Sequence, residues 1–179
     1  MSHRKKIIIA IVGESGAGKT ELTKYMADVH KIPYVASYTT RPMRDGETNG
    51  VEHTFVNEKE MPGFDKMVAY TIFGGYHYWV TIKQIQNPVT TYVIDETGLL
   101  KMIDNFSGKF RFLKVYIRRD NKEGIDNERQ NRDISRKCLK ESFYDVIIDN
   151  NYSTAEEFYE QSSKTIIDKL NKKFHASYE

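Results

Sequence analysis

The chain has 179 residues, of which 29% are charged, and a formal net charge of +2 at pH 7. This length is that of one domain with a core large enough to need no disulfide bond. The single cysteine, Cys138, excludes an intramolecular disulfide and is typical of a reducing cytoplasm. The longest apolar run, residues 7–12, is too short to span a membrane. The small net charge argues neither for nor against nucleic acid. We expect a cytoplasmic monomer or homodimer without nucleic-acid or membrane partners.

The first predicted element is a buried parallel strand near residues 7–12, where the run is apolar and β-branched. A helix is predicted near residues 18–30, which show helical apolar spacing. Between the two lies an eight-residue segment that matches the phosphate-binding pattern G-x-x-x-x-G-K-[ST] at every fixed position. Its residues are Gly13, Glu14, Ser15, Gly16, Ala17, Gly18, Lys19 and Thr20.

The order of strand, glycine loop and helix is the one that phosphate binding requires. Glycines let the backbone curl so that several N–H groups point at one phosphate, and the helix adds its positive end. In such a loop Lys19 reaches the β- and γ-phosphates and the Thr20 hydroxyl holds Mg²⁺. We therefore predict that the segment 13–20, which we call the phosphate loop, binds ATP with magnesium.

The remaining strands are predicted near 34–38, 91–95, 111–117 and 145–149, and the remaining helices near 97–106, 120–142 and 154–173. Strands that alternate with helices predict an α/β fold with a five-stranded parallel core sheet in three layers. Residues 41–82 break this alternation, because glycines and prolines separate short aromatic runs that are typical of antiparallel strands.

We therefore predict a single domain over residues 1–179 with three parts. The core comprises residues 1–36, 83–118 and 137–179. A small mixed α/β subdomain over 37–82 would bind the second substrate, because open α/β sheets bind ligands where such an insertion emerges. A helical lid is predicted over 119–136.

A second group of residues lies in the segment 37–55. Arg41 and Arg44 stand three positions apart across Pro42, which excludes an ordinary helix interior. Arginine suits a bidentate grip on a phosphate. A solvated basic turn is the alternative interpretation of an isolated pair of this kind.

Together with the phosphate loop, this segment resembles the guanylate kinase family. That family carries a Ser-x-x-Thr-Arg-x-x-Arg-x-Gly-Glu segment, followed by a glycine and an aromatic–Phe pair. Looser matches are the segment 73–78, which resembles an F-x-G-x-x-Y element, and the strands near 92–95 and 146–150. The matching residues of the first segment are Ser37, Thr39, Thr40, Arg41, Arg44, Gly46, Glu47, Gly50 and Phe55.

The resemblance implies a phosphate-loop nucleoside monophosphate kinase that uses ATP and Mg²⁺, and it favours GMP or dGMP as the acceptor. By the same resemblance, Arg41, Arg44 and Tyr78 would hold the acceptor phosphate. Ser37 would help to read a purine edge. Asp95 would lie near the magnesium site or the acceptor nucleoside.

The chain departs from the family pattern at three positions. His53 stands where the family has a phosphate-gripping tyrosine, and an imidazole could keep that role. Ala69 replaces a glutamate that accepts hydrogen bonds from guanine, and Val80 replaces a serine or threonine. Specificity for a base arises because leaving a polar edge unpaired costs about 1–3 kcal/mol. Without these two polar side chains, the prediction of guanine specificity loses support. Replacement acceptors could be Thr71, Glu47 or Glu52.

A third group of residues follows the predicted strand 111–117. Arg129, Arg132 and Arg136 fall on one face of a helix. Arginines from a mobile lid can neutralise the charge that phosphoryl transfer spreads over the moving group. We predict that Arg129 and Arg132 join Lys19 and Arg41 as catalytic residues. The alternative is a surface helix whose arginines pair with Glu128, Asp133 and Glu141.

A nucleotide-dependent switch or an NTPase that acts on nucleic acid is one alternative function, but it should carry a long basic surface, which the sequence does not indicate. Two other alternative functions stay open at this point. One is a nucleoside monophosphate kinase with altered or relaxed base specificity, for ribo- or deoxynucleotides, as the changes at Ala69 and Val80 suggest. The other is a non-catalytic interaction module that resembles guanylate kinases. Such modules typically lack the phosphate loop, whereas Lys19 and Thr20 are present here.

Overall fold

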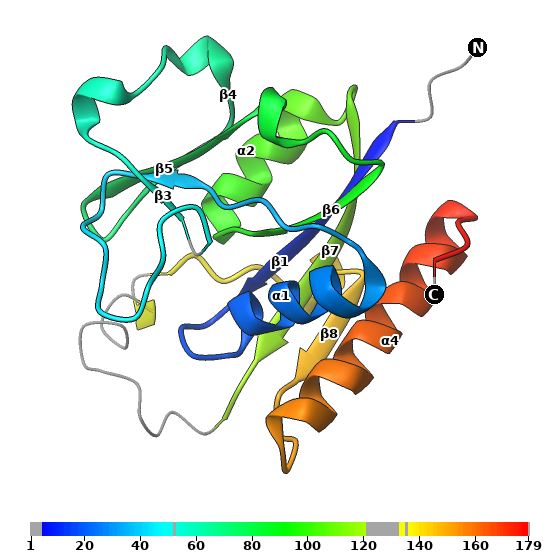
Figure 1. Ribbon diagram of the computed structural model, residues 1–179. Coiled ribbons are helices and arrows are strands. Elements are labelled where there is room, and N and C mark those ends of the chain that lie inside the picture. Colours follow the sequence, from blue (N-terminus) through cyan, green and yellow to red (C-terminus); the bar gives the residue numbers. More distant parts are fainter. Residues whose placement is uncertain (1–4, 52, 121–132, 135, 179) are drawn as a thin grey trace.

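The computed structural model describes residues 5–51, 53–120, 133–134 and 136–178. Its central sheet has the strand order β6-β1-β7-β8, and all neighbouring strands are parallel (Figure 1). The strands are β1 (Lys6–Gly13), β6 (Val89–Val93), β7 (Phe110–Arg118) and β8 (Val146–Asp149). Helices α1 (Lys19–His30), α2 (Glu96–Phe106) and α4 (Ala155–Phe174) accompany it. The predicted α/β class is confirmed.

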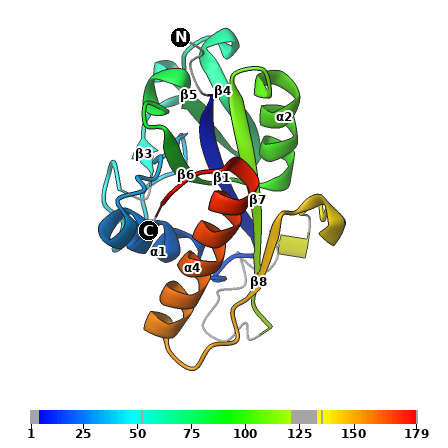
Figure 2. The ribbon, with the colours of Figure 1, turned by 90° about the vertical axis from the view of Figure 1, so that its right-hand side faces the viewer.

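Both faces of β1 are buried, which explains its uninterrupted apolar sequence. Ile7, Ile9 and Ile11 lie in one core cluster with residues of α1 and α4. Ile8 and Ala10 lie in a second cluster with residues of α2 and of the second sheet. In Figure 2, α2 accordingly lies on one side of the central sheet, and α1 and α4 lie on the other. The carboxyl end of β1 is thereby held rigidly where the phosphate loop begins.

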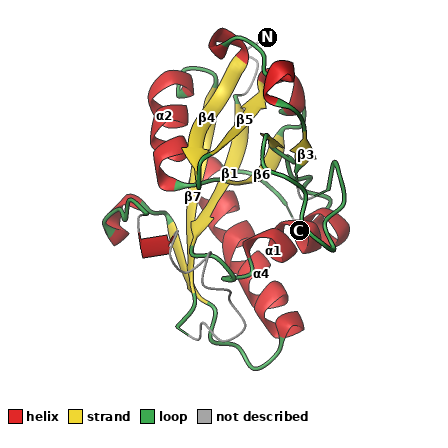
Figure 3. Ribbon diagram, turned by 90° about the vertical axis from the view of Figure 1, so that its left-hand side faces the viewer, coloured by secondary structure: helices red, strands yellow, loops and turns green. Residues whose placement is uncertain are grey.

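The second sheet has the order β3-β2-β5-β4 and is mixed. It consists of β2 (Tyr38–Thr39), β3 (Thr54–Phe55), β4 (Met67–Phe73) and β5 (Tyr76–Thr81). Strand β4 packs beside α2 (Figure 3). Gly74 and Gly75 join β4 to β5 with φ angles of 59° and 80°, and a tight hairpin requires positive φ at both turn positions. The antiparallel strands predicted within 41–82 are present as the pair β4 and β5.

The described residues also include four single turns of 3₁₀ helix. They are Glu58–Glu60, Phe64–Lys66, Ile82–Gln84 and Glu141–Phe143. No helix in the described part of the chain is long and apolar enough to cross a membrane.

The predicted strand 34–38 is not a fifth strand of the central sheet. Its only ladder contact there, among the described residues, is a parallel bridge from Tyr34 to Thr91. Pro33 has no N–H to extend this pairing, and Tyr38 already belongs to the second sheet. The central sheet therefore has four strands in the described part of the chain.

The predicted helix 120–142 is wrong over its described carboxyl-terminal part. Residues 137–140 are not helical, and Glu141–Phe143 is a 3₁₀ turn. Two tertiary contacts bracket this stretch: a buried ion pair of Arg136 and the return of the chain into β8, where Asp145 N–H donates to Lys114. Cys138 is consequently exposed. Residues 121–132, and with them most of the predicted lid, lie outside the described residues.

Candidate active site

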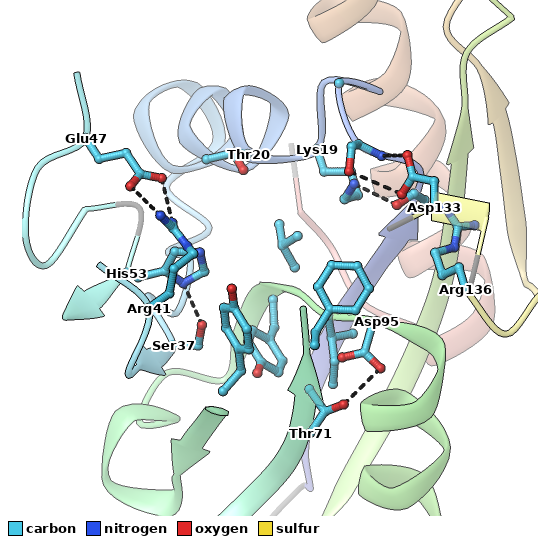
Figure 4. A pocket seen from close by; sticks show the side chains of 18 of the residues that line it. Lys19, Thr20, Ser37, Arg41, Glu47, His53, Thr71, Asp95, Asp133 and Arg136 are labelled. Carbon is cyan, nitrogen blue, oxygen red and sulfur yellow. Dashed lines mark hydrogen bonds and ion pairs between the residues drawn. The ribbon is translucent and has the colours of Figure 1, made fainter. Parts of the chain in front are cut away.

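A cavity of about 270 Å³ opens at the carboxyl ends of β1 and β6, between the phosphate loop and the second sheet (Figure 4). It brings together residues that the sequence places far apart. The predicted site residues that line it are Gly13, Ser15, Gly16, Lys19, Thr20, Ser37, Arg41, Arg44, His53, Tyr78 and Asp95. Arg129 and Arg132 lie outside the described residues, and their predicted roles stay predictions.

Two glycines of the phosphate loop stand where no other residue fits. Gly13 has a φ of 155°, and a Cβ there would lie 2.0 Å from the carbonyl oxygen of Ile117. Gly18 precedes α1 with a left-handed φ of 91°, and its Cβ would lie 2.7 Å from the ring of Phe158. The fixed glycines of the motif therefore follow from close backbone packing against β7 and α4.

Lys19 folds back over the phosphate loop. Its Nζ donates to the carbonyl oxygens of Gly13 and Glu14 at 2.7 and 2.6 Å. Burial, and then repulsion from Arg136, lower the pKa of Lys19 to about 8. An anion bound in the loop would restore the charged form of this amine, as expected for a phosphate-binding lysine.

Two side chains hold the phosphate loop from behind. Asn150, directly after β8, donates from Nδ2 to the carbonyl of Ala17 at 3.0 Å. Arg119, directly after β7, donates from Nη1 to the carbonyl of Gly16 at 3.3 Å. Because these carbonyls accept hydrogen bonds from side chains, the loop is fixed by two residues for which the sequence predicts no individual role.

Asp133 occupies the mouth of the phosphate loop. Its carboxylate accepts hydrogen bonds from the N–H of Ser15 at 2.9 Å and from the Ser15 hydroxyl at 3.2 Å. A carboxylate in this position accepts from the loop as a phosphate oxygen would. The alternative interpretation, in which Asp133 pairs with arginines on a surface helix, missed this contact.

On the opposite side of the cavity, Glu47 fixes Arg41 with two hydrogen bonds of 2.8 and 3.0 Å. Arg41 is only 6% exposed, and its guanidinium also lies 5.3 Å from the ring centre of Phe55. The same carboxylate accepts from the backbone N–H of Arg44 at 2.7 Å. Glu47 therefore organises the arginine pair, and this commitment makes it a poor candidate for reading a base.

His53 and Ser37 face each other in the same wall of the cavity. The Ser37 hydroxyl and His53 Nδ1 are 2.8 Å apart. The imidazole also meets the rings of Tyr78 and Phe55 edge-on, with centres 5.5 and 5.9 Å away. The structure thus places His53 beside the residues predicted to hold the acceptor phosphate.

Ala69 and Val80 lie outside the cavity lining. They are paired in register across β4 and β5 and are 3% and 0% exposed, inside the second core cluster. Thr71, two positions along β4, lines the cavity and donates to Asp95 Oδ1 at 3.4 Å. Asp95 also accepts from the N–H of Gly98 and so caps α2. The polar atoms of this wall therefore come from Thr71 and Asp95.

Comparison with known proteins agrees with this geometry. Residues 4–169 match the model of the family described as guanylate kinase. The chain belongs to the guanylate kinase family. It is 31% identical to the guanylate kinase of Ehrlichia canis over an alignment of 154 residues. That alignment covers 78% of this chain and 73% of that protein.

Two further comparisons extend over nearly the whole chain. A guanylate kinase of Helicobacter pylori is 28% identical over 189 aligned positions, covering 94% of this chain and 91% of that protein. The crystal structure of a guanylate kinase from Anaplasma phagocytophilum superposes with a TM-score of 0.65 over 92% of this chain and 87% of that chain. At 20% identity, that superposition shows the same fold. The phosphate loop described above lies within the residues that the family model matches.

Proposed function

We propose that the chain is an ATP-dependent guanylate kinase that transfers the γ-phosphate of ATP to GMP or dGMP, giving GDP or dGDP. One observation carries the proposal: a single cavity joins an intact phosphate loop to the arginine pair Arg41 and Arg44. Two phosphate-binding groups that face one cavity suit a reaction between two phosphates. The names of the family's relatives supply the choice of guanine.

The residues divide between two phosphates. The N–H groups of the phosphate loop and Lys19 would bind the triphosphate of ATP. Arg41 and Arg44, with His53 and Tyr78, would hold the acceptor phosphate in line with the γ-phosphate. Catalysis then consists of positioning and charge neutralisation. No general base is needed, because the acceptor phosphate is already an anionic nucleophile.

Magnesium belongs to the proposal as the partner of ATP. Among the described residues, no cluster of three or more His, Cys, Asp or Glu side chains could hold a metal. Mg²⁺ does not require such a cluster, because it usually keeps several waters and binds substrate phosphates with few protein ligands. Thr20, which lines the cavity, would supply its hydroxyl. Bound magnesium would neutralise charge on the β- and γ-phosphates.

Two further parts of the proposal rest on the sequence. Arg129 and Arg132 would neutralise the charge of the transferring group. A cytoplasmic location, where ATP is abundant and thiols stay reduced, suits the single cysteine.

A second candidate function is supported by a separate observation on the second sheet. Because Ala69 and Val80 are buried apolar residues, a kinase with altered or relaxed base choice is the alternative. The test is ADP formation from Mg-ATP against the full panel of ribo- and deoxynucleoside monophosphates. Stimulation by GMP and dGMP alone supports the guanylate kinase. A broader or different set supports the alternative, and stimulation by none rejects both.

Two variants test the division of roles. Lys19→Ala should abolish transfer while circular dichroism shows an intact fold, and near-normal turnover would contradict the assignment of the loop. Arg41→Ala should mainly raise the KM of the acceptor. An unchanged acceptor KM would reject the proposed phosphate grip.

A further inference from the structure

His53 and Ser37 form a hydrogen-bonded pair in the wall of the cavity. The Ser37 hydroxyl and His53 Nδ1 lie 2.8 Å apart, and both residues line the cavity (Figure 4). A neutral imidazole with its proton on Nε2 accepts a hydrogen bond from the hydroxyl at Nδ1. An imidazolium has protons on both nitrogens, so its Nδ1–H donates to the serine oxygen instead. Protonation of that neutral form therefore reverses the direction of this hydrogen bond.

The burial of Ser37 favours the neutral ring before an acceptor binds. Ser37 is 4% exposed, and His53 Nδ1 is the one hydrogen-bond partner of its hydroxyl within the part of the chain that the structure describes. If Nδ1 carried a proton, the hydroxyl hydrogen would have no protein acceptor there. A buried donor without an acceptor is costly. The hydroxyl therefore donates to Nδ1, and the ring is neutral.

The charges around His53 favour the same form. The charged and titratable groups that share its side of the cavity are Arg41, Arg44, Glu47 and Tyr78, and Lys19 lies across the cavity in the phosphate loop. Glu47 accepts two hydrogen bonds from Arg41 and so is committed to that arginine. One carboxylate thus stands against two arginines, and like charge disfavours a further cation. An anion that binds between these groups removes that penalty.

A bound acceptor phosphate is such an anion. A phosphate monoester is largely dianionic above pH about 6, and an opposite charge within about 4–6 Å favours the charged form of a histidine. Arg41 and His53 lie against the same ring, since the Arg41 guanidinium carbon is 5.3 Å and the His53 ring centre 5.9 Å from the ring centre of Phe55. The two side chains also meet at Glu47, which holds Arg41 and interacts electrostatically with His53. A phosphate held by Arg41 is therefore within reach of the imidazole.

The Ser37 hydroxyl changes its role when the ring is protonated. Once Nδ1–H donates to the serine oxygen, the hydroxyl hydrogen needs a new acceptor. A ring nitrogen or a carbonyl oxygen on the base of the acceptor is such a group, and the sequence predicts that Ser37 helps to read a purine edge. The phosphate at one end of the pair and the base at the other therefore favour the same proton.

We propose that binding of the acceptor moves a proton from solvent onto His53, so that the imidazolium neutralises the acceptor phosphate and Ser37 becomes a hydrogen-bond donor to the base. The inference rests on the proposed function, because it takes the acceptor to be a nucleoside monophosphate. It extends that function, because one proton couples recognition of the phosphate to recognition of the base. The ligand that satisfies both ends carries a dianionic phosphate and a hydrogen-bond acceptor on the base edge that Ser37 meets.

Titration calorimetry with GMP in the absence of ATP tests for this proton. Buffers of different ionisation enthalpy should reveal that the wild type takes up about half a proton or more at pH 7.5. The affinity for GMP should fall about 5–10-fold between pH 6.5 and pH 8.5, as the neutral ring becomes harder to protonate. Ionisation of the ligand's own phosphate acts in the opposite direction, since a dianion binds arginines more tightly. Despite burial, their mutual hydrogen bonds raise the pKa of Arg41 and lower that of Glu47, so both stay charged over this range.

The variant that isolates the imidazole is His53→Tyr, which keeps an aromatic ring and a hydrogen-bonding hydroxyl but forms no cation. It should bind GMP with less proton uptake and lose the fall in affinity. Burial lowers the pKa of Lys19 to about 8, so this lysine titrates over the same range, and measuring wild type and variant in the same buffers cancels its contribution. The matched control is His77→Tyr. His77 Nδ1 lies 2.7 Å from the Tyr70 hydroxyl, but His77 is outside the cavity lining, so the control should keep the proton uptake.

A measurement on the wild-type protein allows for the chance that His53→Tyr fails to fold. NMR of protein labelled with ¹⁵N in its histidine rings distinguishes the neutral tautomers from the imidazolium. The His53 signals should change from a neutral ring with its proton on Nε2 to an imidazolium when GMP binds at pH 7.5. Ribose 5-phosphate, which has the phosphate without a base, should protonate the ring less than GMP does. In Ser37→Ala this difference between the two ligands should disappear.

Proton uptake that His53→Tyr does not reduce would overturn the inference, as would GMP binding with no change in the His53 ring. Equal protonation by GMP and ribose 5-phosphate in the wild type would overturn the coupling through Ser37. Acceptor-dependent ADP formation tests the proposed function separately. If GMP binds with proton uptake at His53 but is not phosphorylated, the kinase proposal fails and the inference stands. If GMP is phosphorylated but binds without proton uptake, the inference fails and the kinase proposal stands. A chain that binds no monophosphate would reject both.

Discussion

Replacing Glu47 by alanine should destabilise the protein and weaken acceptor binding together. Its carboxylate accepts two hydrogen bonds from the Arg41 guanidinium, at 2.8 and 3.0 Å, and one from the N–H of Arg44 at 2.7 Å. Arg41 is 6% exposed, so Glu47→Ala leaves a buried charge without this partner. Breaking a fully buried pair costs about 3–5 kcal/mol. Because Glu47 itself is 17% exposed, we expect a loss of about 2–3 kcal/mol in the free energy of unfolding.

Two measurements check this expectation. Thermal unfolding should show a decrease in Tm of about 4–12 °C, at about 2–4 °C per kcal/mol for a chain of this size. In the kinase assay the KM of the acceptor should rise about tenfold, the equivalent of about 1.4 kcal/mol, because the guanidinium loses its orientation. The KM of ATP should stay close to that of the wild type. Glu47→Gln, which keeps one oxygen acceptor, should show intermediate effects.

The pH dependence gives an independent check. Burial alone would raise the pKa of Glu47, but the hydrogen bonds from Arg41 and from the Arg44 N–H hold it below its ordinary value of 4.5. The folded state therefore binds this proton less readily than the unfolded state. The resulting stabilisation is complete above pH 4.5 and is lost as the pH falls through the lowered value. Glu47→Ala should lose less stability than the wild type over that acidic range. Equal acid sensitivity, or an unchanged acceptor KM, would refute the reasoning.

Three other predictions concern the rest of the cavity. Because burial, followed by repulsion from Arg136, lowers the pKa of Lys19 to about 8, ATP binding at pH 8 should take up protons. Calorimetry in buffers of different ionisation enthalpy measures this uptake, and its absence would contradict the low pKa. Asp133→Asn should tighten ATP binding in the same titration, since the carboxylate on Ser15 competes with phosphate; unchanged or weaker binding would exclude that competition. Thr71→Val should lower kcat/KM for the preferred acceptor about tenfold, as expected when about 1.4 kcal/mol of polar contact is lost. An unaltered ranking of acceptors in Thr71→Val would remove Thr71 from the base pocket.

The predicted fold is correct where local pattern and tertiary environment agree. β1 is buried on both faces, and its continuous apolar run reports this directly. The strand predicted at 34–38 fails for a non-local reason. Its residues have the composition of a strand, but the choice between two sheets depends on which partner offers N–H and C=O groups, and Tyr38 pairs with Trp79 rather than continuing beside β6.

The site residues also divide into those that a local sequence pattern predicts and those that depend on non-local contacts. The sequence correctly places Lys19 and Thr20 at the cavity, because a fixed spacing ties them to one backbone geometry. The Asp133–Ser15 and Arg136–Glu96 contacts are missed, although Asp133 and Arg136 were named as part of the arginine-rich segment, because charged residues in a charged segment are usually solvated. One signal was available in the sequence. Glu96 follows Asp95 at the carboxyl end of a core strand, where an acidic side chain is directed toward the ligand edge of the sheet.

In the proposed function, phosphate binding and base reading fall to different elements of the cavity, and this separation would affect the choice of acceptor. A pocket rejects a wrong base mainly when the mismatch leaves buried polar groups of the protein unpaired. Ala69 and Val80 have no side-chain polar group to leave unpaired, and both are buried in the core rather than exposed to the ligand. A base other than guanine would therefore lose less binding free energy at β4 and β5 than in a pocket with polar side chains at these two positions. The phosphate loop and Arg41 would hold both phosphates as before. Substitutions on this hairpin should thus change the ratio between acceptors more than the rate with the best one.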